Sequence, residues 1–269
     1  MPWITGEDKI KYIKNITHLL KTIILDNYIF GIRPLMEALE EGKVPERIFI
    51  QKGLTGLNFQ KLFQLIREKQ LPFQMVPVEK LNRITRNNHQ GVVAQIAMIT
   101  YHKLDMLLPG IYETGETPLF VILDKVTDVR NLGAIARSAE CAGAHALIVG
   151  EKSSAPINAD AIKTSAGALS RLPVCREREI LESIAFLKES GITIAACTER
   201  SESNIYQSKL TGPLAIIMGA EDKGISKSCL AMSDIQVSIP QKGRTASLNV
   251  SVATGIVLFE ALRQREFRA

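Results

Sequence analysis

Three short segments of this sequence combine glycine with polar side chains that could carry out group transfer. The segments are Asp128 to Arg137, Met218 to Gly224 and Ile239 to Ala253. Their polar candidates are Asn131, Arg137, Glu221, Ser247 and Asn249. A guanidinium, a carboxylate, a hydroxyl and two amides can hold an anion, orient a hydroxyl group and stabilise charge that develops during a reaction.

Each segment also has a simpler structural explanation. Asn131, Ser247 and Asn249 are residue types that commonly cap helices. Glu221 lies between two glycines, which suit a tight turn, and an arginine such as Arg137 is common on the exposed face of a helix. The functional interpretation therefore depends on whether the three segments meet at one place.

The position of the segments along the backbone favours such a meeting. Each one begins at the end of an apolar run and leads toward a stretch with helical spacing. Pro240 ends the run that starts at Ile235, because proline has no N–H for a sheet ladder. In open α/β proteins, ligands bind where strand ends meet helix starts. Gly133 lies one turn before Arg137, and we expect its missing side chain to leave room for a ligand.

Several common kinds of site do not fit the sequence. The chain has neither a Walker loop nor a GxGxxG fingerprint. His89 has no partners at metal-ligand spacing, so no metal is expected. No CxxC pair occurs, which disfavours a zinc site or a disulfide framework and fits a reducing cytosol. The four cysteines are Cys141, Cys175, Cys197 and Cys229.

Length and composition indicate one large or two small globular domains. The 269 residues are 46% hydrophobic, which is ample for a core. No apolar run approaches the ~18 residues of a membrane span and no secretory signal begins the chain, so we expect a cytoplasmic protein without a membrane partner. Residues 28–100 carry ten Lys/Arg and six Asp/Glu. This basic excess favours a polyanion-binding surface, and a solvated charged face explains it nearly as well.

Hydrophobic periodicity predicts an α/β protein in two parts joined by a linker. Residues 28–100 are expected to form a small α/β domain, with helices at 32–41 and 59–69, a helical turn at 80–85 and strands at 47–51, 73–78 and 92–98. Residues 101–117 contain Pro109 and two glycines and are predicted to be the linker. Residues 1–27 form an N-terminal extension that stays unassigned.

The C-terminal part, 118–269, alternates strands with helices. Strands are expected at 118–126, 146–149, 172–175, 192–197, 214–218 and 235–239. Helices are expected at 132–142, 159–170, 179–190, 225–232 and 250–267. Strands separated by helices predict a parallel sheet with helices on both faces.

Taken in this order, the three segments resemble the SpoU/TrmH branch of the SPOUT methyltransferases. The matching stretches are NLGAIAR at 131–137, GAEDKG at 219–224 and IPQKGRTASLNVSVA at 239–253. FGIRPL and HQGVVA, within 28–98, are similar to that branch's substrate-binding domain, a small fold like that of ribosomal protein L30e. Gln241 stands where the family more often has methionine, and 1–27 have no counterpart.

The resemblance implies methylation of a ribose 2′-hydroxyl in RNA with S-adenosyl-L-methionine as cofactor. It also implies a deep trefoil knot in the C-terminal domain and an obligate homodimer. The last helix would pack at the dimer interface, where Ser251, Thr254 and Gly255 would allow close approach. The residues implied to hold the cofactor are Met218, Gly219, Gly224, Ile239 and Leu248.

The family's catalytic assignment falls on Arg137. A guanidinium holds its proton too firmly to act readily as a base, so we expect Arg137 to grip the phosphate beside the target ribose and to stabilise negative charge. Ser247 and Asn249 are expected to orient the hydroxyl. Glu221 is expected to orient Arg137 or its loop, and Asn131 to fix the loop geometry.

The implied RNA partner is 23S rRNA or a ribosome assembly precursor, because an N-terminal domain beside this catalytic domain resembles enzymes that modify a guanosine of that RNA. The residues expected to contact RNA are Arg83, Arg86, Asn87, Asn88 and His89. Three alternatives stay open: a tRNA ribose methyltransferase, a catalytically silent RNA-binding protein of the same fold, and a small-molecule α/β enzyme.

Overall fold

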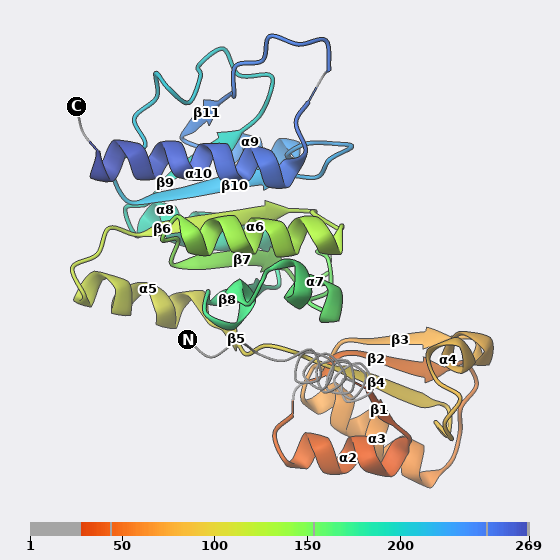
Figure 1. Cartoon of the computed structure of the whole chain (residues 1–269). Helices are drawn as coiled ribbons and strands as arrows, with labels where there is room; N and C mark the ends of the chain where they lie inside the picture. Colours follow the sequence, from red (N-terminus) through yellow and green to blue (C-terminus); the bar gives the residue numbers. More distant parts are fainter. Residues whose placement is uncertain (1–27, 44, 153, 246, 268–269) are drawn as a thin grey trace, which may run out of the picture. The chain divides into compact units, whose positions relative to one another are not determined.

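The computed structural model describes residues 28–43, 45–152, 154–245 and 247–267 (Figure 1). The chain divides into two compact units between Met98 and Ile99. The expected N-terminal extension, 1–27, lies outside the described residues. Within the described part of the chain, no helix is long and apolar enough to cross a membrane.

The N-terminal unit is a small mixed sheet with helices on both faces. Its elements are β1 (Tyr28–Phe30), α2 (Ile32–Glu40), β2 (Pro45–Gln51), α3 (Leu57–Glu68), β3 (Phe73–Val76), α4 (Val78–Ile84) and β4 (Val92–Ile96). The strand order is β1-β4-β2-β3, with β2 and β3 parallel and the other pairs antiparallel. Alternation along β2 explains the layers: Ile48 and Ile50 pack toward α2 and α3, whereas Phe49 packs on the other face with Leu81 of α4.

The C-terminal unit is a seven-stranded parallel sheet. Its strands are β5 (Tyr101–His102), β6 (Leu119–Asp124), β7 (Ala146–Gly150), β8 (Val174–Glu177), β9 (Thr193–Cys197), β10 (Leu214–Gly219) and β11 (Ile235–Val237). Its helices are α5 (Leu104–Glu113), α6 (Val129–Cys141), α7 (Ala159–Thr164), the 3₁₀ turn η1 (Ala168–Ser170), α8 (Ile180–Glu189), α9 (Lys227–Met232) and α10 (Val250–Glu266). The predicted α/β class, with a small α/β domain before a domain built on a parallel sheet, is confirmed.

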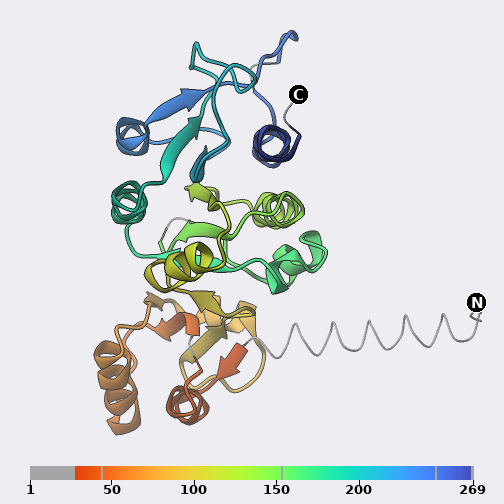
Figure 2. The same ribbon diagram turned by 90° about the vertical axis from the view of Figure 1, so that its left-hand side faces the viewer.

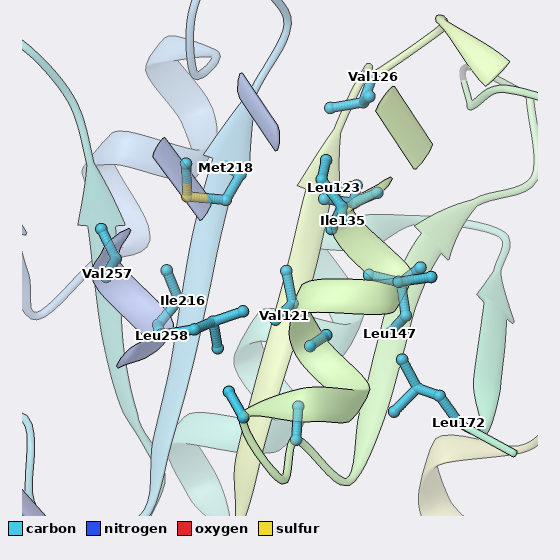
Figure 3. Packing of buried hydrophobic residues seen from close by; sticks show 14 of the residues in the cluster. Val121, Leu123, Val126, Ile135, Leu147, Leu172, Ile216, Met218, Val257 and Leu258 are labelled. Atoms are coloured by element: carbon cyan, nitrogen blue, oxygen red, sulfur yellow. The ribbon is translucent and has the colours of Figure 1, made fainter. Parts of the chain in front are cut away.

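Helices cover both faces of this sheet (Figure 2). Val121 and Leu123 of β6 pack toward α6, α7 and α10, while Phe120 and Ile122 pack toward α5, α8 and α9. Figure 3 shows the first of these layers, in which Val257 and Leu258 of α10 join the apolar side chains of β6 and β10. Since β6 is buried along its whole length, it has the continuous apolar pattern of a central parallel strand.

Strand order in this sheet is β11-β9-β10-β6-β7-β8-β5. From β6 the chain moves outward through β7 and β8, and it later returns to the other side of β6 through β9, β10 and β11. The direction of winding therefore reverses between β6 and β10. The crevice outside the carboxyl ends of such a pair is where open α/β sheets bind ligands.

The prediction of a linker at 101–117 was wrong, because β5 and α5 occupy most of that range and belong to the C-terminal unit. Pro109 and Gly110 lie inside α5 and weaken it by about 3 and about 1 kcal/mol. Against this, Leu104, Leu108 and Ile111 are buried on the sheet, and each contributes about 1.5–3 kcal/mol. Burial outweighs the local preference.

The helix expected at 159–170 is interrupted. The chain turns at Ala166 and Gly167, whose φ angles are 49° and 88°, and resumes as the short turn η1. Glycine tolerates this left-handed conformation better than any other residue.

The last turn of α10 is fastened to the backbone by its side chains. Arg265 donates to the carbonyl oxygens of Thr117 (3.1 Å), Pro118 (3.0 Å) and Gly212 (2.7 Å). Gln264 accepts from the Leu210 N–H at 2.8 Å and donates to the Ser208 carbonyl at 3.0 Å. Burial lowers the pKa of Arg265. These bonds fix the carboxyl end of α10 beside the amino ends of β6 and β10.

Candidate active site

A hydrogen-bonded cluster joins all three polar segments at the carboxyl edge of the sheet. The side-chain amide of Asn131 donates to Glu221 Oε1. The side-chain amide of Asn249 donates to the same oxygen at 2.9 Å and to Asn131 Oδ1 at 3.1 Å. One carboxylate oxygen therefore receives two amide donors from different helices, which holds Glu221 in one orientation.

Helix caps position the two asparagines. Asn131 was expected to cap a helix starting at 132, but α6 starts at Val129 and its cap is Asp128, which accepts the Asn131 N–H at 2.8 Å. Asn131 therefore lies in the first turn, and its side chain is free to reach Glu221. The alternative capping role of Asn249 is confirmed: its Oδ1 accepts from the Ser251 N–H at 2.9 Å. Its oxygen caps α10 while its nitrogen joins the cluster.

Glu221 lies in a turn that only glycine permits. A Cβ on Gly219 would lie 2.2 Å from the carbonyl carbon of Gly224, far inside any real contact distance. Ala220 and Gly224 form a β-bridge across the turn, and Gly224 has a φ of 65°. The close backbone approach turns the chain sharply after β10 and presents the Glu221 side chain to the other two segments.

A cavity of about 460 Å³ opens beside this cluster, at the ends of β9, β10 and β11. Ser247 and Glu221 line it, and so do all five residues expected to hold the cofactor. Those five are Met218, Gly219, Gly224, Ile239 and Leu248. Its volume lies in the range of roughly 300–1,000 Å³ that is usual for small-molecule pockets.

Part of this cavity was missed from the sequence. The missed residues lie at the carboxyl end of β9 and directly after it, and are Cys197, Thr198, Glu199 and Arg200. The available indication was the strand expected at 192–197, whose carboxyl end had to lie at the same sheet edge. Burial, and secondarily Glu199, raises the pKa of the Cys197 thiol to about 12, so this cysteine is a neutral wall residue and a poor nucleophile.

A second, smaller cavity of about 210 Å³ lies on the other side of the Glu221 loop. It is lined from the β6 end by Lys125, Thr127 and Asp128, and the two cavities share the stretch from Ala220 to Asp222. It therefore occupies the crevice between β6 and β10 where the winding of the sheet reverses.

Arg137 does not join the cluster. It is exposed on α6, and across the described residues no hydrogen bond or ion pair connects it to Glu221, Ser247 or Asn249. The expectation that Gly133 leaves ligand space beneath Arg137 was wrong, because a Cβ there would lie 2.6 Å from the Ala161 carbonyl oxygen of α7. The glycine serves helix packing instead.

The outer face of α10 carries apolar side chains. Val252 and Phe259 are 51% and 49% exposed, and their spacing of seven residues places them on one face. Two of the residues expected to allow close approach of a second subunit point into their own chain instead. Thr254 is buried, and Gly255 packs against Ser138 of α6. Ser251 donates its hydroxyl to Asn249.

The residues predicted to contact RNA lie on α4 and the loop that follows it. Arg83, Arg86 and Asn88 are exposed. His89 Nδ1 accepts from the Gly91 N–H at 3.0 Å, and its Nε2 lies 2.9 Å from Asn82 Oδ1. With Nδ1 accepting, Nε2 carries the proton and donates. The imidazole therefore organises the loop, while the arginines remain open to solvent.

The described residues contain no group of three His, Cys, Asp or Glu side chains that could hold a metal ion.

Comparison with known proteins matches both units. The model of the SpoU rRNA Methylase family matches residues 118–259, and that of RNA 2′-O ribose methyltransferase substrate binding matches residues 28–102. The 23S rRNA (guanosine-2′-O-)-methyltransferase RlmB of Yersinia pestis is 37% identical over 250 residues, covering 91% of this chain and 100% of the relative. RlmB of Escherichia coli K12 is 37% identical over 246 residues, covering 90% and 100%.

A solved structure has the same fold. It is the SpoU methyltransferase AviRb from Streptomyces viridochromogenes in complex with AdoMet, with a TM-score of 0.56, 26% identity and coverage of 88% of this chain and 89% of that one. Since the family match spans the C-terminal unit and the relatives are covered along their whole length, this chain belongs to the SpoU rRNA methylase family.

Proposed function

We propose that this protein methylates the ribose 2′-hydroxyl of a guanosine in 23S rRNA, with S-adenosyl-L-methionine as the methyl donor. The observation that carries the proposal is the cluster of Asn131, Glu221 and Asn249 at the mouth of a cofactor-sized cavity. Relatives named for this reaction match the chain along their whole length.

The residues of the larger cavity fit the cofactor. Met218, Ile239, Leu248 and Val250 supply apolar walls, which suit the faces of an adenine ring. The turn from Gly219 to Gly224 supplies backbone groups that can pair with its edge. When bound, S-adenosyl-L-methionine provides a methyl group on a sulfonium. The sulfur leaves readily as a neutral sulfide, so the obstacle to the reaction is the weak nucleophilicity of the ribose hydroxyl.

Glu221, which the sequence suggested only as an orienting residue, is proposed to act on the ribose oxygen. A ribose hydroxyl is a weak acid, so its proton must be accepted or its developing charge stabilised. Within the described residues, hydrogen bonds from Asn131 and Asn249 occupy Glu221 Oε1 and leave Oε2 to accept the hydroxyl proton in a hydrogen bond. Ser247, on the wall of the larger cavity, is proposed to help orient the sugar.

Arg137 is proposed to act on the site of the partner subunit in a homodimer. The apolar face of α10 at Val252 and Phe259 would pair across a two-fold axis. Arg137 is exposed on α6 next to Ser138, which packs against Gly255 of α10, and we propose that it reaches the partner subunit from there. There its guanidinium would hold the phosphate beside the target ribose and stabilise negative charge.

The trefoil knot is proposed from family membership together with strand order. The chain leaves β11 at one edge of the sheet and must pass β9 and β10 to place α10 against α6. Single-molecule stretching of the denatured chain would test it, since a retained knot shortens the contour length and an unknotted chain reaches full extension.

The substrate RNA is tested by mapping ribose methylation in ribosomal RNA from cells with and without this gene. We expect one guanosine of 23S rRNA to lose its methyl group, in a reaction located in the cytoplasm. A transfer RNA substrate is the second candidate, because a TrmH/SpoU tRNA modifying enzyme of A. aeolicus is 31% identical, although that match covers 61% of this chain. Transfer RNA should be mapped in the same cells, and an unchanged pattern in both RNAs would refute the proposal.

A further inference from the structure

The smaller cavity has no role in the chemistry described so far. It lies in the crevice between the ends of β6 and β10, the usual ligand position in a sheet of this kind. The proposed cofactor cavity is displaced from that crevice toward β9 and β11. The crevice is therefore open for a second ligand, and the reaction requires one within bonding distance of the methyl group.

We infer that the smaller cavity receives the base of the target nucleotide and recognises it as guanine through the carboxylates of Asp128 and Asp222. The inference rests on the proposed function and deepens it by naming the residues that select the base.

Size favours a single base. At about 210 Å³ the cavity is smaller than the roughly 300–1,000 Å³ of pockets that enclose a whole small molecule. Enzymes that act on a base take it out of its stack and into a pocket, and the same movement would bring the ribose of an unpaired nucleotide to this site. With the base inside this cavity, the attached ribose lies at the shared wall of Ala220 to Asp222, beside Glu221. That wall separates the base from the methyl donor, and the ribose oxygen lies between them.

The chemistry of the lining favours guanine. Three carboxylates, from Asp128, Glu221 and Asp222, face one ammonium group, from Lys125. Such a lining accepts hydrogen bonds and repels phosphate, so the nucleotide enters base first and its backbone stays outside near Lys125. Guanine alone among the four bases offers two adjacent N–H donors, N1–H and the N2 amino group, on its pairing edge.

Both carboxylates have oxygens available. Asp128 uses Oδ1 to accept the Asn131 N–H, and among the described residues no hydrogen bond occupies its Oδ2. The Asp222 side chain is exposed and makes no hydrogen bond or ion pair within the same part of the chain. Glu221 is already held by two amides, which leaves the two aspartates to recognise the base.

The test compares guanosine with inosine, which lacks the N2 amino group, at the mapped methylation position of a synthetic RNA segment. For the wild-type enzyme we expect kcat/KM to be roughly 10- to 100-fold higher on guanosine. In Asp128→Asn and Asp222→Asn the guanosine rate should fall toward the inosine rate. Asparagine caps helices as well as aspartate does, so Asp128→Asn preserves α6. Asp105→Asn, the same substitution in the first turn of α5 and outside both cavities, should leave the ratio unaltered.

Binding of S-adenosylhomocysteine, measured by calorimetry, separates base recognition from cofactor binding and should be unchanged in Asp128→Asn. Equal wild-type rates on the two RNAs, or an unchanged ratio in both variants, would overturn the inference and leave the proposed function intact. A mapped target other than guanosine would overturn the inference together with the guanosine part of the proposed function, and leave RNA ribose methylation standing. If the wild-type enzyme methylated no RNA at all, the proposed function would fail and the inference with it.

Discussion

The candidate catalytic cluster and the N-terminal loop proposed to contact RNA are held in place by different kinds of hydrogen bond. In the C-terminal unit, the hydrogen bonds of Asn249 reach residues 28 and 118 positions away. In the N-terminal unit, His89 holds its loop through partners two and seven positions away. A site tied over long separations forms only when the whole sheet is assembled, whereas a loop tied locally keeps its shape largely by itself. Changes in the first should alter chemistry or folding sharply, and changes in the second should alter RNA affinity in small steps.

The largest expected effect concerns whether the C-terminal site extends over two subunits. Arg137→Ala and Glu221→Gln should each lower kcat about 10²- to 10³-fold without weakening cofactor binding, because the first removes a charge that stabilises the reacting oxygen and the second removes the carboxylate that accepts its proton. If Arg137 serves the partner subunit, co-expression of the two variants should restore about one quarter of wild-type activity, since half of randomly assorted dimers contain one intact site. No recovery would mean that Arg137 acts within its own chain or not at all.

Gly219→Ala should damage the long-range site through the backbone. The added Cβ overlaps the Gly224 carbonyl carbon, and overpacking of this kind costs about 1–3 kcal/mol. We expect a lower melting temperature and loss of S-adenosylhomocysteine binding in calorimetry. Gly110→Ala is the matched control, because its Cβ meets open space in a helix and should raise stability by up to about 1 kcal/mol. Equal behaviour of the two variants would contradict the role given to the turn.

Substitutions of Asn249 can separate its role as the N-cap of α10 from its hydrogen bond to Glu221. Asn249→Ser keeps a good N-cap for α10 but removes the amide donor to Glu221, whereas Asn249→Ala removes both. We expect Asn249→Ala to be about 1 kcal/mol less stable than Asn249→Ser in urea unfolding. Both should lose roughly 10- to 100-fold in kcat, the value of a hydrogen bond to a charged group. Wild-type turnover in Asn249→Ser would exclude the amide from the reaction.

The smallest expected effects belong to the N-terminal loop. Arg83→Ala and Arg86→Ala should each weaken RNA binding and lower the slope of log affinity against log salt by about one, as expected for one lost phosphate contact. Cofactor binding should not change. Lys61→Ala, on the exposed side of α3, is the control and should leave the slope as it is. A large loss of kcat in the arginine variants would contradict the prediction that this loop affects RNA affinity and not the chemical step.

Much of the fold was predictable because its strongest patterns are local. The apolar runs and helical spacings gave the parallel sheet and its helices, and the glycines at 219 and 224 marked a turn beside a cavity. The linker prediction failed since Pro109 and Gly110 are typical of loops, while the burial that stabilises α5 depends on a sheet assembled from distant strands. Gly133 was misinterpreted for a similar reason. Its missing side chain makes room for α7, and the packing of α7 against α6 is not evident from the sequence.

Within the candidate site, the residue types were predictable and their geometry was not. Asp128 and Asn131 are both good caps, so the sequence did not indicate which one starts α6. The smaller cavity depends on β6 and β10 being adjacent, and strand order is not encoded in any single segment. Arg137 matches its family position, yet it is exposed and no hydrogen bond or ion pair among the described residues joins it to the cluster, so its proposed role requires a second copy of the chain.

The bonds from Arg265 and Gln264 have a practical meaning for anyone who handles this enzyme. One uninterrupted helix connects them to Asn249, so the amide beside the carboxylate is positioned from the far end of a rigid rod. We expect a purification tag fused close to Arg265 to perturb these bonds and, through the helix, the position of the Asn249 amide. Activity measured with a carboxyl-terminal fusion should therefore be compared with the cleaved protein before any substitution is interpreted.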